Sequence, residues 1–217
     1  VRTAHATGFA GGFVNERLIA YHEARARGGV SLSILEIASV HPTSLGSISG
    51  FLDQAMEGWA TIAERCHAHG MMLFQQIWHG GAHAFSADGG PAWAPSAIPS
   101  VVDGRLPLAM SETMIDEVVE GFAATARRCQ QAGLDGVEVH GAHGYLLCQF
   151  LSPLTNRRTD DYGGSLENRM RLTTRVMQAI RHAVGPHYPI GIRLGPEAPP
   201  GGLPADDVRD VAVALER

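Results

Sequence analysis

Short apolar runs alternate with longer amphipathic segments along most of this 217-residue chain. The apolar runs predict strands at residues 30–36, 71–77, 137–139 and 189–194, and the end of an earlier strand at residues 1–6. The amphipathic segments predict helices at residues 16–27, 53–69, 111–131, 165–184 and 204–217. Such an alternation is typical of βαβ units, which place their strands in a parallel sheet. The sequence therefore predicts an α/β fold with about five strand–helix units.

Turn and capping residues set the expected limits of the helices. Gly28 and Gly29 follow the first helix, and Gly70 follows the second, as glycines commonly do at helix C-termini. Asp53 is expected to open the second helix, and Ser111 is expected to cap the third. These signals separate each helix from the strand that follows or precedes it.

The segment at residues 82–110 shows neither the two-residue period of a strand nor the 3.6-residue period of a helix. Glycine and proline are frequent between Gly89 and Pro107. A loop of this length inside a domain is commonly functional. We therefore expect one domain over residues 1–217, with a small hairpin or lid over its mouth at about residues 82–110.

Charge and composition limit the classes of partner. The net charge is −5 and the isoelectric point is about 6.1, with no block of lysine or arginine. Nucleic acids and anionic membrane surfaces require basic patches, so we expect neither as a partner. A small-molecule substrate is expected, and a homo-oligomer is left open.

Targeting signals and cysteine usage indicate the compartment. No apolar run reaches the roughly 18 residues that a membrane span needs, and no secretory leader opens the chain. The cysteines are odd in number and widely spaced, at Cys66, Cys129 and Cys148. This usage fits reduced thiols better than a disulfide framework. We therefore expect a cytoplasmic protein.

Three chemically active side chains, His140, His143 and Tyr145, follow the strand predicted at residues 137–139. In a (β/α)8 barrel, catalytic residues lie where the strands end and the loops begin, so we interpret these three as a catalytic group. A metal pair is the alternative interpretation of the two histidines. Zinc sites need three or four ligands, and no carboxylate or thiol is suitably spaced to complete one. No metal site is predicted.

Two further polar residues lie in otherwise apolar strands. Gln76 offers a donor and an acceptor together, whereas Gln75 should point to the opposite face because strand side chains alternate. Arg193 lies in the apolar run at residues 189–194, where a cation is costly unless it is paired. Two structural alternatives are left open: Gln76 as a polar residue that ends a strand, and Arg193 as the partner of a carboxylate.

The residues from 140 to 169 carry a resemblance. The motif begins His140-Gly-Ala-His143-Gly-Tyr145-Leu-Leu and continues through Gln-Phe-Leu-Ser-Pro, Asn-Arg-Arg-Thr-Asp and Tyr-Gly-Gly-Ser-Leu-Glu-Asn-Arg. This run resembles the signature of the old yellow enzyme family of FMN oxidoreductases. The resemblance implies a (β/α)8 TIM barrel, non-covalent FMN, NAD(P)H as the reductant, and reduction of activated C=C bonds in enones, enoates and nitroalkenes.

The resemblance also implies a role for each candidate residue. His140 and His143 would hydrogen-bond the carbonyl or nitro oxygen of the substrate, and Tyr145 would give a proton to its α carbon as hydride arrives from flavin N5. Gln76 would bind the pyrimidine edge of the flavin, and Arg193 would stabilise negative charge near N1 and O2. The residues expected beside the flavin are Ala4, His5 and Ile37, the last through its backbone.

A second motif, Trp78-His-Gly-Gly-Ala-His83, resembles the trimethylamine dehydrogenase branch of the family. That branch attaches its flavin through a cysteine where this chain has Ala6, so a covalent flavin by that route is excluded. It also has an aromatic cage residue where this chain has Ile37, and a methylated ammonium needs such a cage. Amine oxidation is therefore disfavoured. His79 and His83 are expected to line the mouth without a catalytic role, and the residues interpreted as structural are Glu36, Asn168 and Arg169.

Length sets a further expectation. A barrel of this kind typically needs about 250 residues, and both ends of the sequence look cut. With about five of eight units present, the strands whose loops hold phosphate in many barrels are absent, so tight FMN binding by the chain alone is not expected. Two alternatives are left open: the barrel portion of a larger FMN, 4Fe-4S and FAD enzyme of the dienoyl-CoA reductase or amine dehydrogenase type, and an inactive fragment unable to hold FMN.

Overall fold

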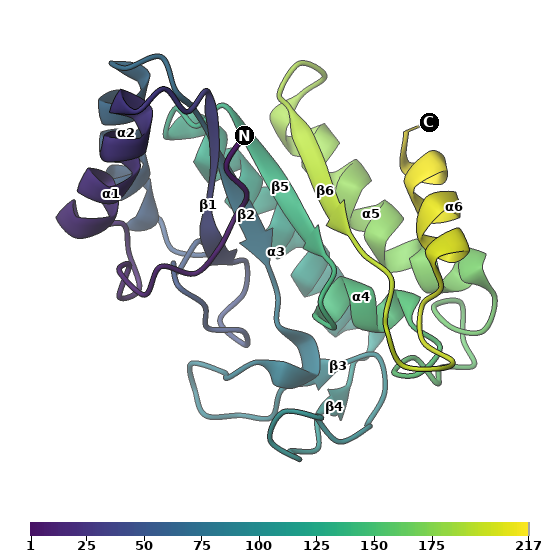
Figure 1. Ribbon diagram of the computed structural model, residues 1–217. Helices are drawn as coiled ribbons and strands as arrows, with labels where there is room; N and C mark the ends of the chain where they lie inside the picture. Colours follow the sequence, from purple (N-terminus) through teal and green to yellow (C-terminus); the bar gives the residue numbers. More distant parts are fainter. Residues whose placement is uncertain (217) are drawn as a thin grey trace.

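The computed structural model describes residues 1–216. Its centre is a sheet of four parallel strands in the order β1-β2-β5-β6 (Figure 1). The strands are β1 (Leu32–Ser39), β2 (Met72–Trp78), β5 (Gly136–Gly141) and β6 (Ile190–Leu194). Two further short strands, β3 (Trp93–Ala94) and β4 (Leu108–Ala109), form a separate pair.

Helices connect the strands of the main sheet. The long ones are α1 (Glu16–Arg27), α2 (Ala55–His67), α3 (Glu112–Gln131), α5 (Leu166–Val184) and α6 (Ala205–Leu215). Two short elements follow strand ends, the 3₁₀ helix η1 (Gly81–His83) and helix α4 (Leu146–Leu151). The predicted alternation of strands and helices is confirmed, whereas α4 was not predicted.

The order of the strands in the sheet equals their order in the chain. Because parallel crossovers are right-handed, consecutive neighbours place all their helices on the same side of the sheet. Figure 1 shows α3 and α5 together on one side of β5 and β6. A barrel has this one-sided arrangement, whereas a doubly wound sheet has helices on both faces. The opposite face of the sheet is the inner face of the barrel arc.

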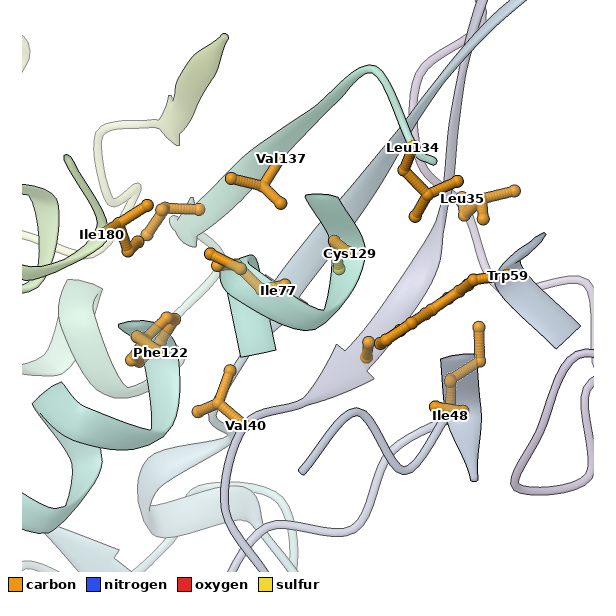
Figure 2. Close-up of a cluster of buried hydrophobic side chains, with 14 of the residues drawn as sticks. Leu35, Val40, Ile48, Trp59, Ile77, Phe122, Cys129, Leu134, Val137 and Ile180 are labelled. Carbon is orange, nitrogen blue, oxygen red and sulfur yellow. The ribbon is translucent and has the colours of Figure 1, made fainter. Parts of the chain in front are cut away.

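The core lies between the outer face of the sheet and the helices. Figure 2 shows Val137 of β5, Phe122 of α3 and Ile180 of α5 in one buried cluster. Trp59 of α2 donates its Nε1 hydrogen to Gln75 Oε1 over 2.9 Å. Gln75 therefore faces the helices, which confirms that it points away from the inner face.

The N-terminal segment differs from the prediction of a strand at residues 1–6. Only Arg2 pairs with β1, through a parallel bridge to Ser33. Farther along, the Thr7 backbone N–H donates to Glu36 Oε2 over 2.6 Å. The segment thus runs beside β1 and is tied to it at both ends without forming a ladder.

Two helix starts test the capping predictions. Ser111 accepts the Met114 backbone N–H over 3.3 Å, which confirms it as the cap of α3. Asp53 does not cap α2, so that prediction was wrong; its carboxylate pairs instead with Arg128 at 2.6 Å. An ion pair to a neighbouring helix has replaced the local cap.

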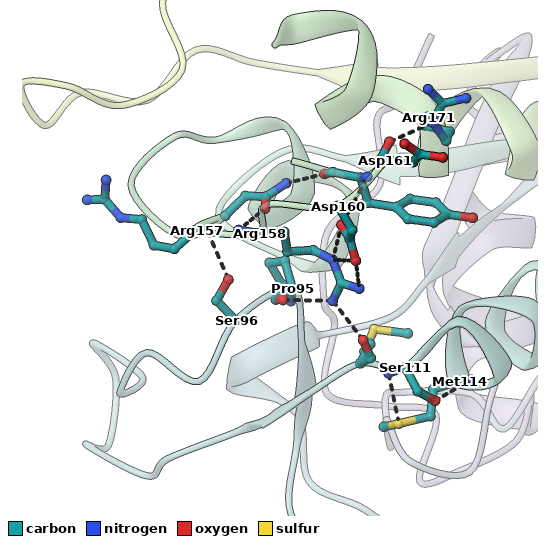
Figure 3. A network of polar contacts seen from close by, with 12 residues as sticks. Pro95, Ser96, Ser111, Met114, Arg157, Arg158, Asp160, Asp161 and Arg171 are labelled. Atoms are coloured by element: carbon teal, nitrogen blue, oxygen red, sulfur yellow. Dashed lines mark hydrogen bonds and ion pairs between the residues drawn. The ribbon is translucent and has the colours of Figure 1, made fainter. Parts of the chain in front are cut away.

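The segment at residues 82–110 does not contain the expected hairpin. Its strands β3 and β4 run parallel, so a loop must carry the chain back between them. Arg158 fastens the segment by donating to the Pro95 carbonyl over 3.0 Å and to the Met110 carbonyl over 2.7 Å (Figure 3). We call residues 82–110 the lid segment, because it follows the carboxyl end of β2.

Two other sequence expectations concern the whole chain. Within residues 1–216, no helix is both long and apolar enough to cross a membrane. Cys66, Cys129 and Cys148 are buried and free. Burial raises the pKa of the Cys66 and Cys148 thiols to about 11, so both are protonated at neutral pH.

Candidate active site

Four polar side chains share the inner face of the sheet. In the register of the parallel ladder, Gln76 of β2 pairs with Glu138 of β5, and His140 of β5 pairs with Arg193 of β6. Glu138 and His140 are two residues apart, so they point to the same face. Gln75 of β2 lies on the other face. The sheet therefore brings together Gln76, His140 and Arg193, which were predicted, with Glu138, which was not.

His140 is a neutral hydrogen-bond donor held by the backbone. Its Nδ1 accepts the Ala142 N–H over 3.3 Å, so its hydrogen lies on Nε2. The side chain is buried, and burial lowers its pKa to about 3, with further lowering by the charges of His143 and Arg193. A neutral imidazole at physiological pH can donate to an oxygen without adding a charge to the site.

His143 adopts a backbone conformation that is unusual for its residue type. Its φ is 59°, the one positive φ outside glycine within residues 1–216. This left-handed conformation costs about 1 kcal/mol or more for a residue with a Cβ. It brings the His143 Nδ1 to 3.3 Å from His140 Nε2, with the two rings nearly perpendicular at 87°. His140 Nε2 donates to His143 Nδ1, which leaves the His143 Nε2 hydrogen free.

Tyr145 stands at the start of α4, beside both histidines. Its ring lies edge-on to His140, with the centroids 5.1 Å apart, and to Trp78, at 5.2 Å. The Tyr145 hydroxyl makes no hydrogen bond within the described part of the chain. It therefore remains available as a donor.

A cavity of about 630 Å³ opens beside these residues. His143, Tyr145 and Trp78 line it from the ends of the strands. Val101 and Val102, at the exposed end of the lid segment, line it from the other side. A volume of this size accommodates a small organic molecule.

The Arg193 side chain makes no hydrogen bond or ion pair with any of residues 1–216. It is half-buried on β6, and no carboxylate of residues 1–216 lies within the 4.0 Å of an ion pair. The structural alternative, an Arg–carboxylate pair, is therefore not observed in that range. On the same strand, two residues before Arg193, a Cβ at Gly191 would meet only the Val137 carbonyl, at 3.9 Å, so space lies open over Gly191. A half-buried cation facing open space fits an electron-rich planar group.

Gln76 is buried and directed along the inner face. Its Nε2 donates to Glu138 Oε1 over 2.6 Å. Burial raises the pKa of Glu138, while the hydrogen bond from Gln76 and the charge of Arg193 lower it in part. Sequence reasoning missed Glu138, although a carboxylate between two valines in a buried strand was a usable signal.

The remaining predicted residues divide into two groups. Ile37 lines the cavity, at the irregular step of β1 between Leu35 and Ala38. Ala4 and His5 lie in the N-terminal segment, and the His5 ring contacts Arg2 and Tyr21, on the side of α1. No described contact joins the His5 side chain to the histidine pair.

Two expectations about the mouth had different outcomes. His83 lines the cavity, as expected. His79 does not, because it is 1% exposed and its Nε2 lies 3.1 Å from Thr43 Oγ1. Burial lowers the pKa of His79 to about 3. It is a neutral core residue, and the expectation that it lines the mouth was wrong.

Glu36 and Arg169 make the contacts expected of structural residues, whereas the contact of Asn168 lies within α5 and does not test its interpretation. Glu36 holds Thr7, and Arg169 joins α5 to α6 through Asp207 at 3.0 Å. Asn168 accepts a hydrogen bond from Arg171 over 2.9 Å. No group of three or more metal-binding side chains occurs in the part of the chain that the structure describes.

Comparison with known proteins shows the family to which the chain belongs. Residues 3–211 match the model of the NADH:flavin oxidoreductase / NADH oxidase family. The chain belongs to this family. The match leaves out only the ends of the chain, and it covers all six residues described at the site, Gln76, Glu138, His140, His143, Tyr145 and Arg193. The expected relationship to the old yellow enzymes is thus confirmed.

Individual family members agree with this assignment. An NADH oxidase from Thermoanaerobacter brockii is 40% identical over 212 residues, which cover 94% of this chain and 33% of that protein. The chain therefore spans about a third of the length of this relative.

Solved structures confirm the fold as part of a (β/α)8 barrel. A 2-naphthoyl-CoA reductase complex superposes with a TM-score of 0.91 at 28% identity, over 99% of this chain and 36% of that one. An old yellow enzyme from Pichia sp. superposes with a TM-score of 0.80 at 33% identity, over 87% of this chain and 53% of that one.

Proposed function

We propose that this chain contributes the catalytic face of an FMN-dependent oxidoreductase that reduces activated C=C bonds with electrons from NAD(P)H. The observation that carries the proposal is the grouping of His140, His143 and Tyr145. The last two line the cavity, and His140 is the register partner of Arg193, which is unpaired within residues 1–216. Two neutral donors and a free phenol suit a substrate oxygen and a neighbouring carbon better than they suit a metal ion.

The inner face supplies the groups that would hold FMN. FMN bound there would supply the hydride-transfer chemistry that links NAD(P)H to the substrate. Gln76 would hold the pyrimidine edge, since its Oε1 is free while its Nε2 donates to Glu138. Arg193 would face the electron-rich side of the ring. Ala4, His5 and Ile37 would contact the ring through the backbone, which is consistent with the His5 side chain lying toward α1.

The cavity residues would act on the substrate. The His143 Nε2 hydrogen is free, whereas the His140 Nε2 hydrogen is donated to His143 Nδ1 and would turn to the substrate oxygen when one binds. Together they would bind one carbonyl or nitro oxygen and stabilise the charge that develops on it. Tyr145 would donate its hydroxyl proton to the α carbon, because a phenol is protonated at neutral pH.

Reconstitution tests this proposal. The chain is titrated with FMN, and the quenching of flavin fluorescence gives the Kd. The complex is then mixed anaerobically with NADH or NADPH, and with 2-cyclohexenone as the acceptor. We expect bleaching of the flavin band by at least one nicotinamide and reoxidation by the enone. Flavin that binds and is reduced, yet is reoxidised by no activated alkene, would contradict the substrate class.

A further inference from the structure

We infer that Glu138 is a positioning residue of the flavin site: it holds the Gln76 amide in one orientation and offsets part of the positive charge of Arg193. This inference rests on the proposed function. It adds a residue to which neither the sequence motifs nor the relatives' names assign a role. The carboxylate touches neither the substrate cavity nor the histidine pair, so its action is indirect.

Glu138 fixes the orientation of the Gln76 amide. An unrestrained amide can rotate and exchange its donor and its acceptor. A carboxylate only accepts, so Glu138 Oε1 at 2.6 Å selects the rotamer of Gln76 with Nε2 toward β5. The Gln76 Oε1 is thereby turned away from Glu138. A ring edge that carries one N–H between two carbonyl oxygens needs this acceptor in a constant place.

Glu138 also offsets part of the positive charge of Arg193. Glu138 on β5 is the register partner of Gly191 on β6, and Arg193 follows two residues later on the same face. Glu138 and Arg193 form no ion pair within 4.0 Å, yet the charge of Arg193 lowers the pKa of Glu138. A carboxylate at this distance weakens the field of the guanidinium at the open space beside Gly191. Glu138 would therefore limit how strongly the site favours reduced flavin over oxidised flavin.

Two substitutions separate these effects. Glu138→Gln removes the charge but keeps an acceptor oxygen for Gln76. Glu138→Asp keeps the charge but withdraws the oxygen from Gln76. Glu120→Gln, an exposed position on α3, is the matched control. Each variant is reconstituted with FMN, and two quantities are measured: the Kd for oxidised FMN by fluorescence quenching, and the midpoint potential of bound FMN by dye equilibration.

We expect opposite patterns from the two variants. Glu138→Gln should shift the ratio of oxidised to reduced flavin binding about tenfold toward the reduced form, or about 30 mV positive for a two-electron couple, with the Kd for oxidised FMN nearly unchanged. Glu138→Asp should weaken the binding of oxidised FMN about fivefold, as for one lost hydrogen bond. It should leave the midpoint potential near that of the unmodified protein. Glu120→Gln should change neither quantity.

The outcomes distinguish this inference from the proposed function. An unmodified chain that shows no binding of FMN at any concentration, weak binding included, overturns both. If the unmodified chain binds FMN, but Glu138→Gln leaves the potential unchanged and Glu138→Asp leaves the Kd unchanged, only the inference is overturned. A residue that is merely structural would lower the thermal stability of the apoprotein without moving the potential. If one variant fails to fold, the other still tests its own half.

Discussion

His140 on β5 and Arg193 on β6 are register partners, so a neutral hydrogen-bond donor and a guanidinium lie side by side on the inner face of the sheet. Neighbouring strands are about 4.8 Å apart. The residue proposed to face the flavin, Arg193, therefore lies next to the residue proposed to bind the substrate, His140. Arg193 also contributes to the low pKa of His140. The cation that would face the flavin thus helps to keep neutral the imidazole that would bind the substrate.

Replacement of Tyr145 by phenylalanine should slow only the step that needs a proton. The ring contacts to His140 and Trp78 do not involve the hydroxyl, so the cavity should keep its shape. We expect the rate of flavin reoxidation by an enone to fall about 10²- to 10⁴-fold. Flavin reduction by NAD(P)H, measured by stopped flow in the same variant, serves as the internal control and should stay within twofold. An unchanged reoxidation rate would exclude Tyr145 as the donor.

Three buried histidines should make the fold sensitive to mild acid. Burial lowers the pKa of His22, His79 and His140 from 6.5 to about 3. Between these values the unfolded chain binds more protons than the folded chain, so stability falls as the pH falls from about 6.5 toward 3. From pH 7 to pH 5, each histidine should remove about 1 to 2 kcal/mol from the free energy of unfolding.

Urea denaturation at several pH values between 7 and 5 measures this slope. Carboxylates with lowered pKa titrate below this window and contribute little to it. His22→Gln should flatten the slope, whereas His187→Gln, at an exposed position, should leave it unchanged. A free energy of unfolding that is constant from pH 7 to pH 5 would contradict the assignment of neutral buried histidines.

Gly81, the first residue of η1, leaves no room for a side chain. A Cβ there would lie 2.2 Å from Gln149 Oε1, and φ is +60°. Gly89 has a similar φ of +74° but open space around it. Gly81→Ala should therefore destabilise the fold more than Gly89→Ala, by about 1 to 3 kcal/mol. Urea denaturation of the two variants gives the difference, and equal losses would mean that Gln149 moves aside freely.

The anchoring of the lid segment depends on the shape of a guanidinium. Arg158 reaches the carbonyls of Pro95 and Met110 and also pairs with Asp160 at 2.5 Å (Figure 3). A lysine ammonium cannot span these three acceptors at once. Arg158→Lys should raise the rate of limited proteolysis within residues 82–110 by several fold. Arg127→Lys, at an exposed position on α3, is the control and should leave the rate unchanged.

The sequence predicted the elements whose signals are local. The long helices α3 and α5 carry serine caps and apolar faces, and both were located within one or two residues. The grouping of His140, His143 and Tyr145 followed from their position after one strand. Periodicity and capping are properties of neighbouring residues, so the sequence alone reveals them.

The features that the sequence did not predict depend on distant contacts. His79 is buried and contacts Thr43, 36 residues away in sequence, and β3 pairs in parallel with β4 across a loop that has no period of its own. Asp53 is of a residue type that commonly caps helices, but its carboxylate pairs instead with Arg128, which lies 75 residues away in sequence. Glu138 drew no interpretation because its partner Gln76 is on another strand, 62 residues away in sequence.

The most direct test of the site is the binding of a phenol. After reconstitution with FMN, the chain is titrated with p-hydroxybenzaldehyde, and the visible spectrum is recorded for the unmodified chain, a His140→Ala/His143→Ala variant and the exposed control His187→Ala. We expect a long-wavelength charge-transfer band in the unmodified chain and the control, and its loss in the double variant with little change in the Kd for FMN. A band that persists in the double variant would show that the histidine pair does not bind the substrate oxygen, and would contradict the proposed site.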